Sequence, residues 1–273
     1  MGSWRRAEAA VVPPALRLQL GLTAVLAALT VLALGVLYAG DSEPGPVDAR
    51  IGTAAYDVGS PWRHVALALD FLGEPAGATA LVVTLMAGCL LLRRPRAAAL
   101  VAAGAAAAVV AATLLKSLVG RTIHGGGNLS YPSGHTAFAT ALALAVALTA
   151  TGRLGLGRTA GTALMLGAAL TAGAAMGWAQ VALGAHYPTD ALGGWCTALA
   201  VVPAAAWLVD RTADRMADRA AGPMADRRTD GTTDRPAGRT AGRKADPSTD
   251  RRADRMAGRT AGPTAGTGRR EVR

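Results

Sequence analysis

Apolar residues in this chain form long uninterrupted runs that are separated by short polar segments. Six runs approach or reach the roughly 20 residues that a helix needs to cross about 30 Å of hydrocarbon. They occupy residues 18–39, 75–92, 97–119, 134–151, 159–182 and 191–209. Residues 64–73, just before the second run, carry Asp70 and are expected to form an interfacial or partly buried turn of helix. The pattern predicts an all-α, polytopic membrane protein with six transmembrane helices.

The first run has an alternative interpretation as a signal peptide, because Arg5 and Arg6 precede it. Its apolar stretch is longer than a signal-peptide core, and residues 38–41 form a poor cleavage site. We expect the helix to be retained in the protein.

Composition agrees with the apolar pattern. Hydrophobic residues make up 51% of the 273 residues and charged residues only 17%, with a mean hydropathy of +0.30. Charge is therefore crowded into a few places, as is typical of an integral membrane protein. We expect membrane lipids as partners and no nucleic acid. Cys89 and Cys196 both fall inside apolar runs without metal-ligand spacing, and no metal site is expected.

Basic residues flank alternate ends of the six runs, which predicts how the chain is oriented. Lys and Arg resist translocation and stay in the cytoplasm. The basic residues that flank the runs are Arg5, Arg6 and Arg17 before the first run, Arg93, Arg94 and Arg96 after the second, Arg153 and Arg158 after the fourth, and those of the tail. The N-terminus and the tail are therefore expected in the cytoplasm of a plasma-membrane protein. The acidic loop with Asp41, Glu43, Asp48 and Asp57 is expected on the extracytoplasmic side, with the ends of the third and fifth runs.

The tail, residues 211–273, repeats in units of about four residues and contains no Leu, Ile or Phe. It holds 16 basic and nine acidic residues, so +7 of the net charge of +10 lies there. We expect it to be disordered. It is either a solvated low-complexity extension, which the interspersed aspartates favour, or a segment that contacts anionic lipid head groups.

Two short strings at the ends of apolar runs combine residue types that suit phosphate chemistry. In the first, Tyr131 to His135, Ser133 is placed to cap the following helix, whose first backbone N–H groups then form an anion site. Gly134 lets a ligand approach closely, and His135 lies in the first turn beside that anion.

The second string runs from His186 to Asp190 at the start of the sixth run. The carboxylate is close enough in sequence to hold one imidazole nitrogen and leave the other as a nucleophile. Lys116 and Arg121 precede the first string on the same expected side of the membrane. By itself, Lys116 is best explained by snorkelling at the hydrocarbon edge, but its neighbours favour a binding role.

These residues resemble a known family. Lys116 with Arg121, the string 132–135 and the string VALGAHYPTD that ends at Asp190 are similar to the three signature blocks of the type 2 phosphatidic acid phosphatase (PAP2) family. This family is the membrane branch of the acid phosphatase and vanadium haloperoxidase superfamily. The resemblance covers residues 97–210 and implies a six-helix membrane phosphatase without metal or cofactor, working through a phosphohistidine.

The resemblance also implies residue roles. His186 is the expected nucleophile, Asp190 orients it, and His135 is the general acid for the leaving alkoxide. The expected phosphate ligands are Lys116, Arg121, Ser133 and Gly134.

The chain departs from the family pattern in two blocks. The first block has Ile123 and His124 where the family has Arg-Pro, and Arg121 is expected to substitute. The third has Ala179 and Gln180 where the family has Ser-Arg. Gln180 is expected to donate an uncharged hydrogen bond to the substrate, which predicts weaker phosphate binding or a different ester.

The sequence therefore predicts an N-terminal membrane region (1–96), a PAP2-like catalytic core (97–210) and a disordered tail (211–273). The expected activity is hydrolysis of lipid phosphate monoesters or pyrophosphates, of the phosphatidic acid or polyprenyl phosphate type, with an extracytoplasmic active site. Two alternatives stay open. One is a lipid phosphotransferase on the same scaffold, and the other is a non-catalytic membrane protein that binds lipid phosphates.

Overall fold

The computed structural model describes residues 10–55, 58–125 and 127–230, and this part of the chain is helical apart from its connections. A 3-10 turn, η1 (Pro14–Leu16), leads into α1 (Arg17–Leu37). The helices that follow are α2 (Pro46–Ala55), α3 (Ser60–Gly73), α4 (Pro75–Leu91), α5 (Pro95–Val119), α6 (Gly134–Leu154), α7 (Arg158–Ala182) and α8 (Pro188–Asp230).

Five of these helices are long and apolar enough to cross a membrane, and the count is six when α3 and α4 together form one bent span. The fold class predicted from the apolar runs is confirmed. α3 and α4 meet at an angle of 67°. The bend has a local cause, because Glu74 is extended (φ −68°, ψ 156°) and precedes Pro75, and a residue before proline avoids the helical region.

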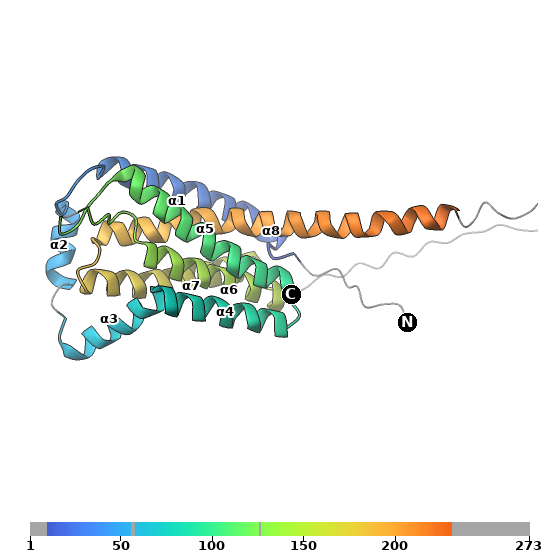
Figure 1. Ribbon diagram of the computed structural model, residues 1–273, viewed down its shortest axis with the longest axis horizontal. Coiled ribbons are helices and arrows are strands. Elements are labelled where there is room, and N and C mark those ends of the chain that lie inside the picture. Colours follow the sequence, from blue (N-terminus) through green and yellow to red (C-terminus); the bar gives the residue numbers. More distant parts are fainter. Residues whose placement is uncertain (1–9, 56–57, 126, 231–273) are drawn as a thin grey trace, which may run out of the picture. The chain divides into compact units, whose positions relative to one another are not determined.

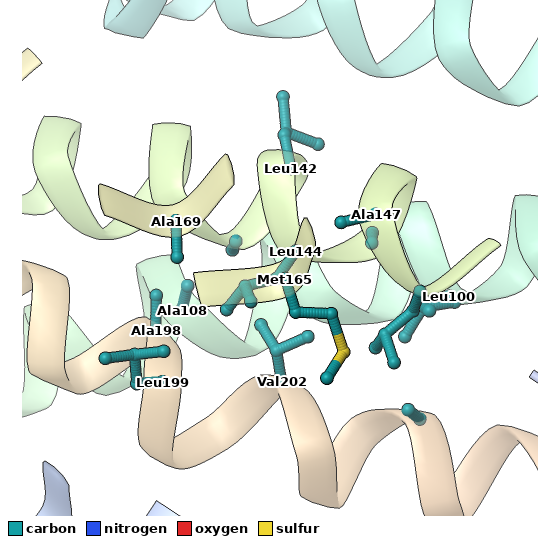
Figure 2. Close-up of a cluster of buried hydrophobic side chains, with 14 of the residues drawn as sticks. Leu100, Ala108, Leu142, Leu144, Ala147, Met165, Ala169, Ala198, Leu199 and Val202 are labelled. Carbon is teal, nitrogen blue, oxygen red and sulfur yellow. The ribbon is translucent and has the colours of Figure 1, made fainter. Parts of the chain in front are cut away.

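Small residues let the helices of the bundle approach closely. α6 packs against both α5 and α7. Its alanines 137, 141 and 145 are completely buried, as are Ala169 of α7 and Ala198 of α8. Figure 2 shows Leu144, Met165 and Val202 filling the space between α6, α7 and α8. Tight contact through small side chains is how helices associate in hydrocarbon, where apolar burial gives little driving force.

The outer surface of α1 is apolar, as expected for contact with lipid. Leu18, Leu22 and Leu26 are 57–70% exposed. At one end of the bundle, α2 lies beside the α5–α6 and α7–α8 connections (Figure 1). This end carries both histidine strings.

The expectation that the tail is disordered from residue 211 is wrong for its first 20 residues, since α8 continues to Asp230. Ala, Arg and Met are good helix formers, and Arg211 and Asp214 are spaced to pair along the helix. Arg96 pairs with Asp214 (2.8 Å) and Asp210 (3.6 Å), which fastens this part of α8 to the start of α5. The rest of the tail lies outside the described residues.

Asp210 also holds the beginning of the described chain. Its two carboxylate oxygens accept hydrogen bonds from the backbone N–H groups of Val11 (2.8 Å) and Val12 (2.9 Å). The described chain from residue 10 to Asp226 forms one compact unit. Helices before and after residue 96 thus belong to the same body.

Candidate active site

The loop before α6 is clamped to the start of α8. Ser133 is buried and caps α6, its Oγ accepting hydrogen bonds from the Thr136 hydroxyl (3.0 Å) and backbone N–H (3.4 Å). The predicted N-cap is therefore confirmed. The Ser133 N–H donates to the Asp190 carbonyl oxygen (2.9 Å), and Gly194 is in such close contact with the Ser133 carbonyl that a Cβ there would overlap it. At Gly134 a Cβ would meet nothing within 4 Å, so the space in front of the helix start is open.

His186 and Asp190 lie together at the start of α8, as the second string predicts. The side chain of Asp190 is completely buried and that of His186 is 8% exposed. His186 Nδ1 lies 3.8 Å from Asp190 Oδ2, which is within ion-pair range but longer than a hydrogen bond. Nδ1 makes no hydrogen bond within the part of the chain described. The same Oδ2 accepts a hydrogen bond from the Tyr187 N–H (3.0 Å), which fixes the carboxylate.

Arg121 occupies a different place from the one expected of a phosphate ligand. Its side chain is completely buried; Nη1 donates to Asp190 Oδ1 and the Thr189 hydroxyl, and Nη2 donates to Asp48 Oδ2, each at 2.7 Å. The structure thus corrects the sequence expectation, because both terminal nitrogens already bind protein acceptors. Burial alone lowers the pKa of Arg121, but the Asp190 and Asp48 carboxylates outweigh it and the net pKa is raised. The guanidinium therefore stays charged.

The rings of Tyr38 and Tyr187 lie on the Arg121 guanidinium, with centroids 4.1 and 4.5 Å from its central carbon. Aromatic faces favour a cation when water is excluded. The Arg121 guanidinium is thus held in place by two aromatic rings as well as by two carboxylates.

Asp48 is a site residue that the sequence analysis missed. It was assigned to an acidic extracytoplasmic loop, but in the structure it is completely buried. Besides Arg121, it accepts hydrogen bonds from the Thr189 N–H and hydroxyl, both at 2.9 Å. Besides the nearby Gly45 N–H, which donates to Asp48 Oδ2 at 3.3 Å, its partners Arg121 and Thr189 are more than 70 residues away, so the sequence does not separate Asp48 from the exposed Asp41 and Glu43.

His135 faces two carboxylates from the α3–α4 bend. Its Nε2 lies 3.5 Å from Asp70 Oδ1 and 3.7 Å from Glu74 Oε1. Neither acid was assigned to the site from the sequence. The available signal was an aspartate within an apolar stretch, followed by an acid directly before a proline.

Gln180 also differs from its expected role as a phosphate ligand. It is 1% exposed, and its Nε2 donates to Asp70 Oδ1 at 2.7 Å. Its backbone carbonyl accepts hydrogen bonds from the N–H groups of Ala185 (2.9 Å) and His186 (3.3 Å). Gln180 therefore connects the His135 side of the site, through Asp70, with the loop that carries His186.

Lys116 lies in the last turn of α5, where its Nζ donates to the Leu129 carbonyl oxygen (3.0 Å). Leu129 lies two residues before the first histidine string, and the Ser133 N–H of that string donates to the Asp190 carbonyl oxygen of the second string (2.9 Å). The two histidine strings and Lys116 thus come together at one end of the bundle.

Asp70, Glu74 and His135 form the one group of three possible metal donors found among the described residues, with atoms within 4.8 Å of one another. Gln180 already donates to the same Asp70 oxygen that faces His135. We interpret the group as two carboxylates that face the His135 ring at ion-pair distance. The expectation of metal-independent chemistry stays a prediction.

Comparison with known proteins places the chain in a family. Residues 16–214, well over half of the chain, match the PAP2 superfamily. A search of curated proteins returned no significant match. Among solved structures, the fold is similar to that of a transmembrane PAP2-type phosphatidylglycerolphosphate phosphatase from Bacillus subtilis, with a TM-score of 0.55 and 23% sequence identity over 71% of this chain and 96% of that chain. The chain is therefore a membrane protein that belongs to the PAP2 superfamily.

Proposed function

We propose that this protein is a membrane lipid phosphatase that cleaves its substrate through a phosphohistidine. The observation that carries the proposal is the meeting of His135, Lys116 and the His186–Asp190 pair at one end of the bundle. Family membership supports phosphatase chemistry at this place.

In the first step, His186 Nε2 attacks the phosphorus, because Asp190 faces the other ring nitrogen, Nδ1. A P–N bond forms while the P–O bond to the lipid breaks, and His135 donates a proton to the departing oxygen. Water then attacks the phosphoenzyme, the P–N bond breaks, and His135 takes up the proton of that water. The products from a phosphate monoester are the lipid alcohol and inorganic phosphate, and those from a pyrophosphate are the lipid monophosphate and inorganic phosphate.

The phosphate oxygens are stabilised by the Lys116 ammonium and by the backbone N–H groups at the start of α6, which Ser133 caps and Gly134 leaves open. Arg121 forms an ion pair with Asp190 and holds its carboxylate in place instead of contacting the phosphate. Gln180 likewise holds the Asp70 carboxylate in place, by a hydrogen bond, instead of contacting the phosphate.

An apolar cavity supports a lipid as the leaving group. It has a volume of about 480 Å³ and is bordered by α3, α4, α6 and α7. Leu69 and Leu72 line it on either side of Asp70 in sequence, and Phe138 lines it one turn after His135. A hydrocarbon chain in this cavity directs its ester oxygen toward His135. Phosphatidic acid, polyprenyl phosphates or pyrophosphates, and the phosphatidylglycerolphosphate on which the Bacillus neighbour acts are the candidate substrates.

For the topology we propose a plasma-membrane protein with cytoplasmic ends and an extracytoplasmic site. Arg93 and Arg94 lie in the short α4–α5 connection and Arg153 lies in the last turn of α6, at the opposite end of the helices from the two histidine strings. The excess of arginine there supports that orientation.

The test is phosphate release by the detergent-purified full chain from a panel of lipid phosphates and pyrophosphates, with EDTA present. We expect turnover of at least one lipid, and a loss of at least about 10⁴-fold in His186→Ala, since removal of a nucleophile eliminates the covalent route. His64→Ala is the matched control, because His64 is exposed on α3 and its ring hydrogen-bonds the Ser60 carbonyl oxygen of its own helix. Retained phosphate release in His186→Ala would refute the proposal. Transfer of the phosphoryl group to an added alcohol, instead of water, would identify a phosphotransferase.

A further inference from the structure

The α3–α4 bend brings Asp70 against a histidine that follows it by 65 residues. Gly73, the last residue of α3, touches the His135 ring so closely that a Cβ there would overlap Cδ2 of the imidazole. The ring therefore rests directly on the backbone of the bend. Asp70, one turn earlier, directs Oδ1 toward His135 Nε2 at 3.5 Å.

Packing holds α3 in this position. Ala66 of α3 is completely buried against Ala179 and Ala182 of α7. The rings of Trp62 and Trp178 meet edge to face, with centroids 6.2 Å apart. The position of the Asp70 carboxylate is thus set by the contact between two helices, in addition to its own rotamer.

The partner of Asp70 is a neutral amide. Gln180 Nε2 donates to Asp70 Oδ1 at 2.7 Å, and the glutamine is buried. An amide fixes a carboxylate in place without cancelling its charge, whereas a guanidinium forms an ion pair, as Arg121 does with Asp190. The negative charge of Asp70 therefore remains available to His135, whose Nε2 has no hydrogen-bond partner within the described residues.

We infer that Asp70, held by Gln180, is a positioning residue that orients His135 and stabilises its protonated form. This inference rests on the proposed function of His135 as general acid. Asp70 holds the Nε2–H, and Nδ1 gives its proton to the leaving oxygen as the P–O bond breaks. In the second step Nδ1 takes a proton from the attacking water, and the imidazolium next to Asp70 is restored.

Glu74 is the other carboxylate near His135, and the structure gives it a smaller part. Its side chain is 52% exposed, and its oxygen lies 3.7 Å from Nε2. No hydrogen bond to the Glu74 side chain is observed within the described residues, so solvent screens its charge more effectively.

The experiment compares Asp70→Asn with the unaltered protein on two substrates with different leaving groups, in EDTA. With a short-chain phosphatidic acid, whose alkoxide is a poor leaving group, we expect kcat to fall by about 100-fold, the scale of general-acid catalysis. With p-nitrophenyl phosphate, whose leaving oxygen needs no protonation, we expect the rate of the pre-steady-state burst of nitrophenol, which reports the first step alone, to change by less than about threefold. Gln180→Met, which removes the amide donor, is expected to show the same selectivity to a smaller extent, and Glu74→Gln a smaller effect than Asp70→Asn.

Glu43→Gln controls for loss of a negative charge elsewhere, because Glu43 is exposed and lies outside the site. Equal losses of lipid turnover and of the nitrophenol burst rate in Asp70→Asn would overturn the inference. Loss of activity together with the thermal unfolding transition would also overturn it, because Asp70 would then be a structural residue. Absence of turnover in the unaltered protein, or activity in His186→Ala, would instead refute the proposed function itself.

Discussion

The two histidines of the site lie in contrasting surroundings. On the His186 side, Asp190, Arg121 and Asp48 are completely buried and form a continuous network of short ion pairs. On the His135 side, Asp70 and Glu74 are 27% and 52% exposed, and the buried donor is the neutral amide of Gln180. The two surroundings fit the roles proposed above, because a nucleophile needs one fixed orientation, whereas a general acid must exchange protons with water.

The largest effect is expected from breaking the buried network. Arg121→Met leaves Asp48 and Asp190 as buried carboxylates without their cation, and removing one partner of such a pair costs about 3–5 kcal/mol. We expect a strongly lowered midpoint of thermal unfolding in detergent, together with loss of phosphate release. Arg63→Met is the matched control, since Arg63 is exposed on α3. Equal midpoints for the two variants would contradict the structural role of Arg121.

An intermediate effect is expected on the His135 side of the site. It concerns activity instead of stability. Gly73→Ala places a methyl group where the His135 ring lies, so the ring must move. Misplacing a catalytic group by about 1 Å costs up to about 100-fold in turnover. Gly88→Ala in α4 is the control, because a Cβ at Gly88 meets nothing within 4 Å. The measurement is kcat and the unfolding midpoint of both variants, and we expect only kcat of Gly73→Ala to fall. Unchanged turnover in Gly73→Ala would argue against the close contact between Gly73 and His135.

The smallest effect on stability is expected from Glu74→Gln, and Asp48→Asn is the equivalent substitution on the His186 side. Glu74→Gln removes a half-exposed charge, and we expect a loss of less than about 1 kcal/mol in stability. Asp48→Asn removes a completely buried charge that pairs with Arg121, and we expect a loss of about 2–3 kcal/mol. Thermal unfolding of both variants measures the difference. Similar shifts would mean that the two sides are equally accessible to solvent.

Much of the fold was accessible from the sequence because transmembrane helices follow a local rule. A run of about 20 apolar residues must satisfy its backbone within one helix, whatever surrounds it. The six runs, the break before Pro75 and the Ser133 cap are all readable in this way, and the structure confirms the helices and the cap. The absence of large apolar residues beyond residue 210 predicts disorder, but helix propensity and ion pairing extend α8 to Asp230.

The site residues also fall into those placed by local sequence and those placed by partners distant in sequence. The sequence strings alone identify His135, His186 and Asp190, because each string has a fixed local geometry. The places of Arg121 and Gln180 depend on partners distant in sequence, since Asp48 precedes Arg121 by 73 residues and Asp70 precedes Gln180 by 110. A polar side chain that has no partner close to it in the sequence can still bind such a distant residue instead of the substrate.

The sequence by itself determined that the chain is a helical membrane protein with two histidine strings of the PAP2 type, because hydropathy and helix capping act over a few turns. Only the tertiary structure decided which charges pair with each other and which face the site. Burial removes water as a competing partner, and a charge then binds whatever opposite group or dipole the packing of the helices brings within about 3 Å.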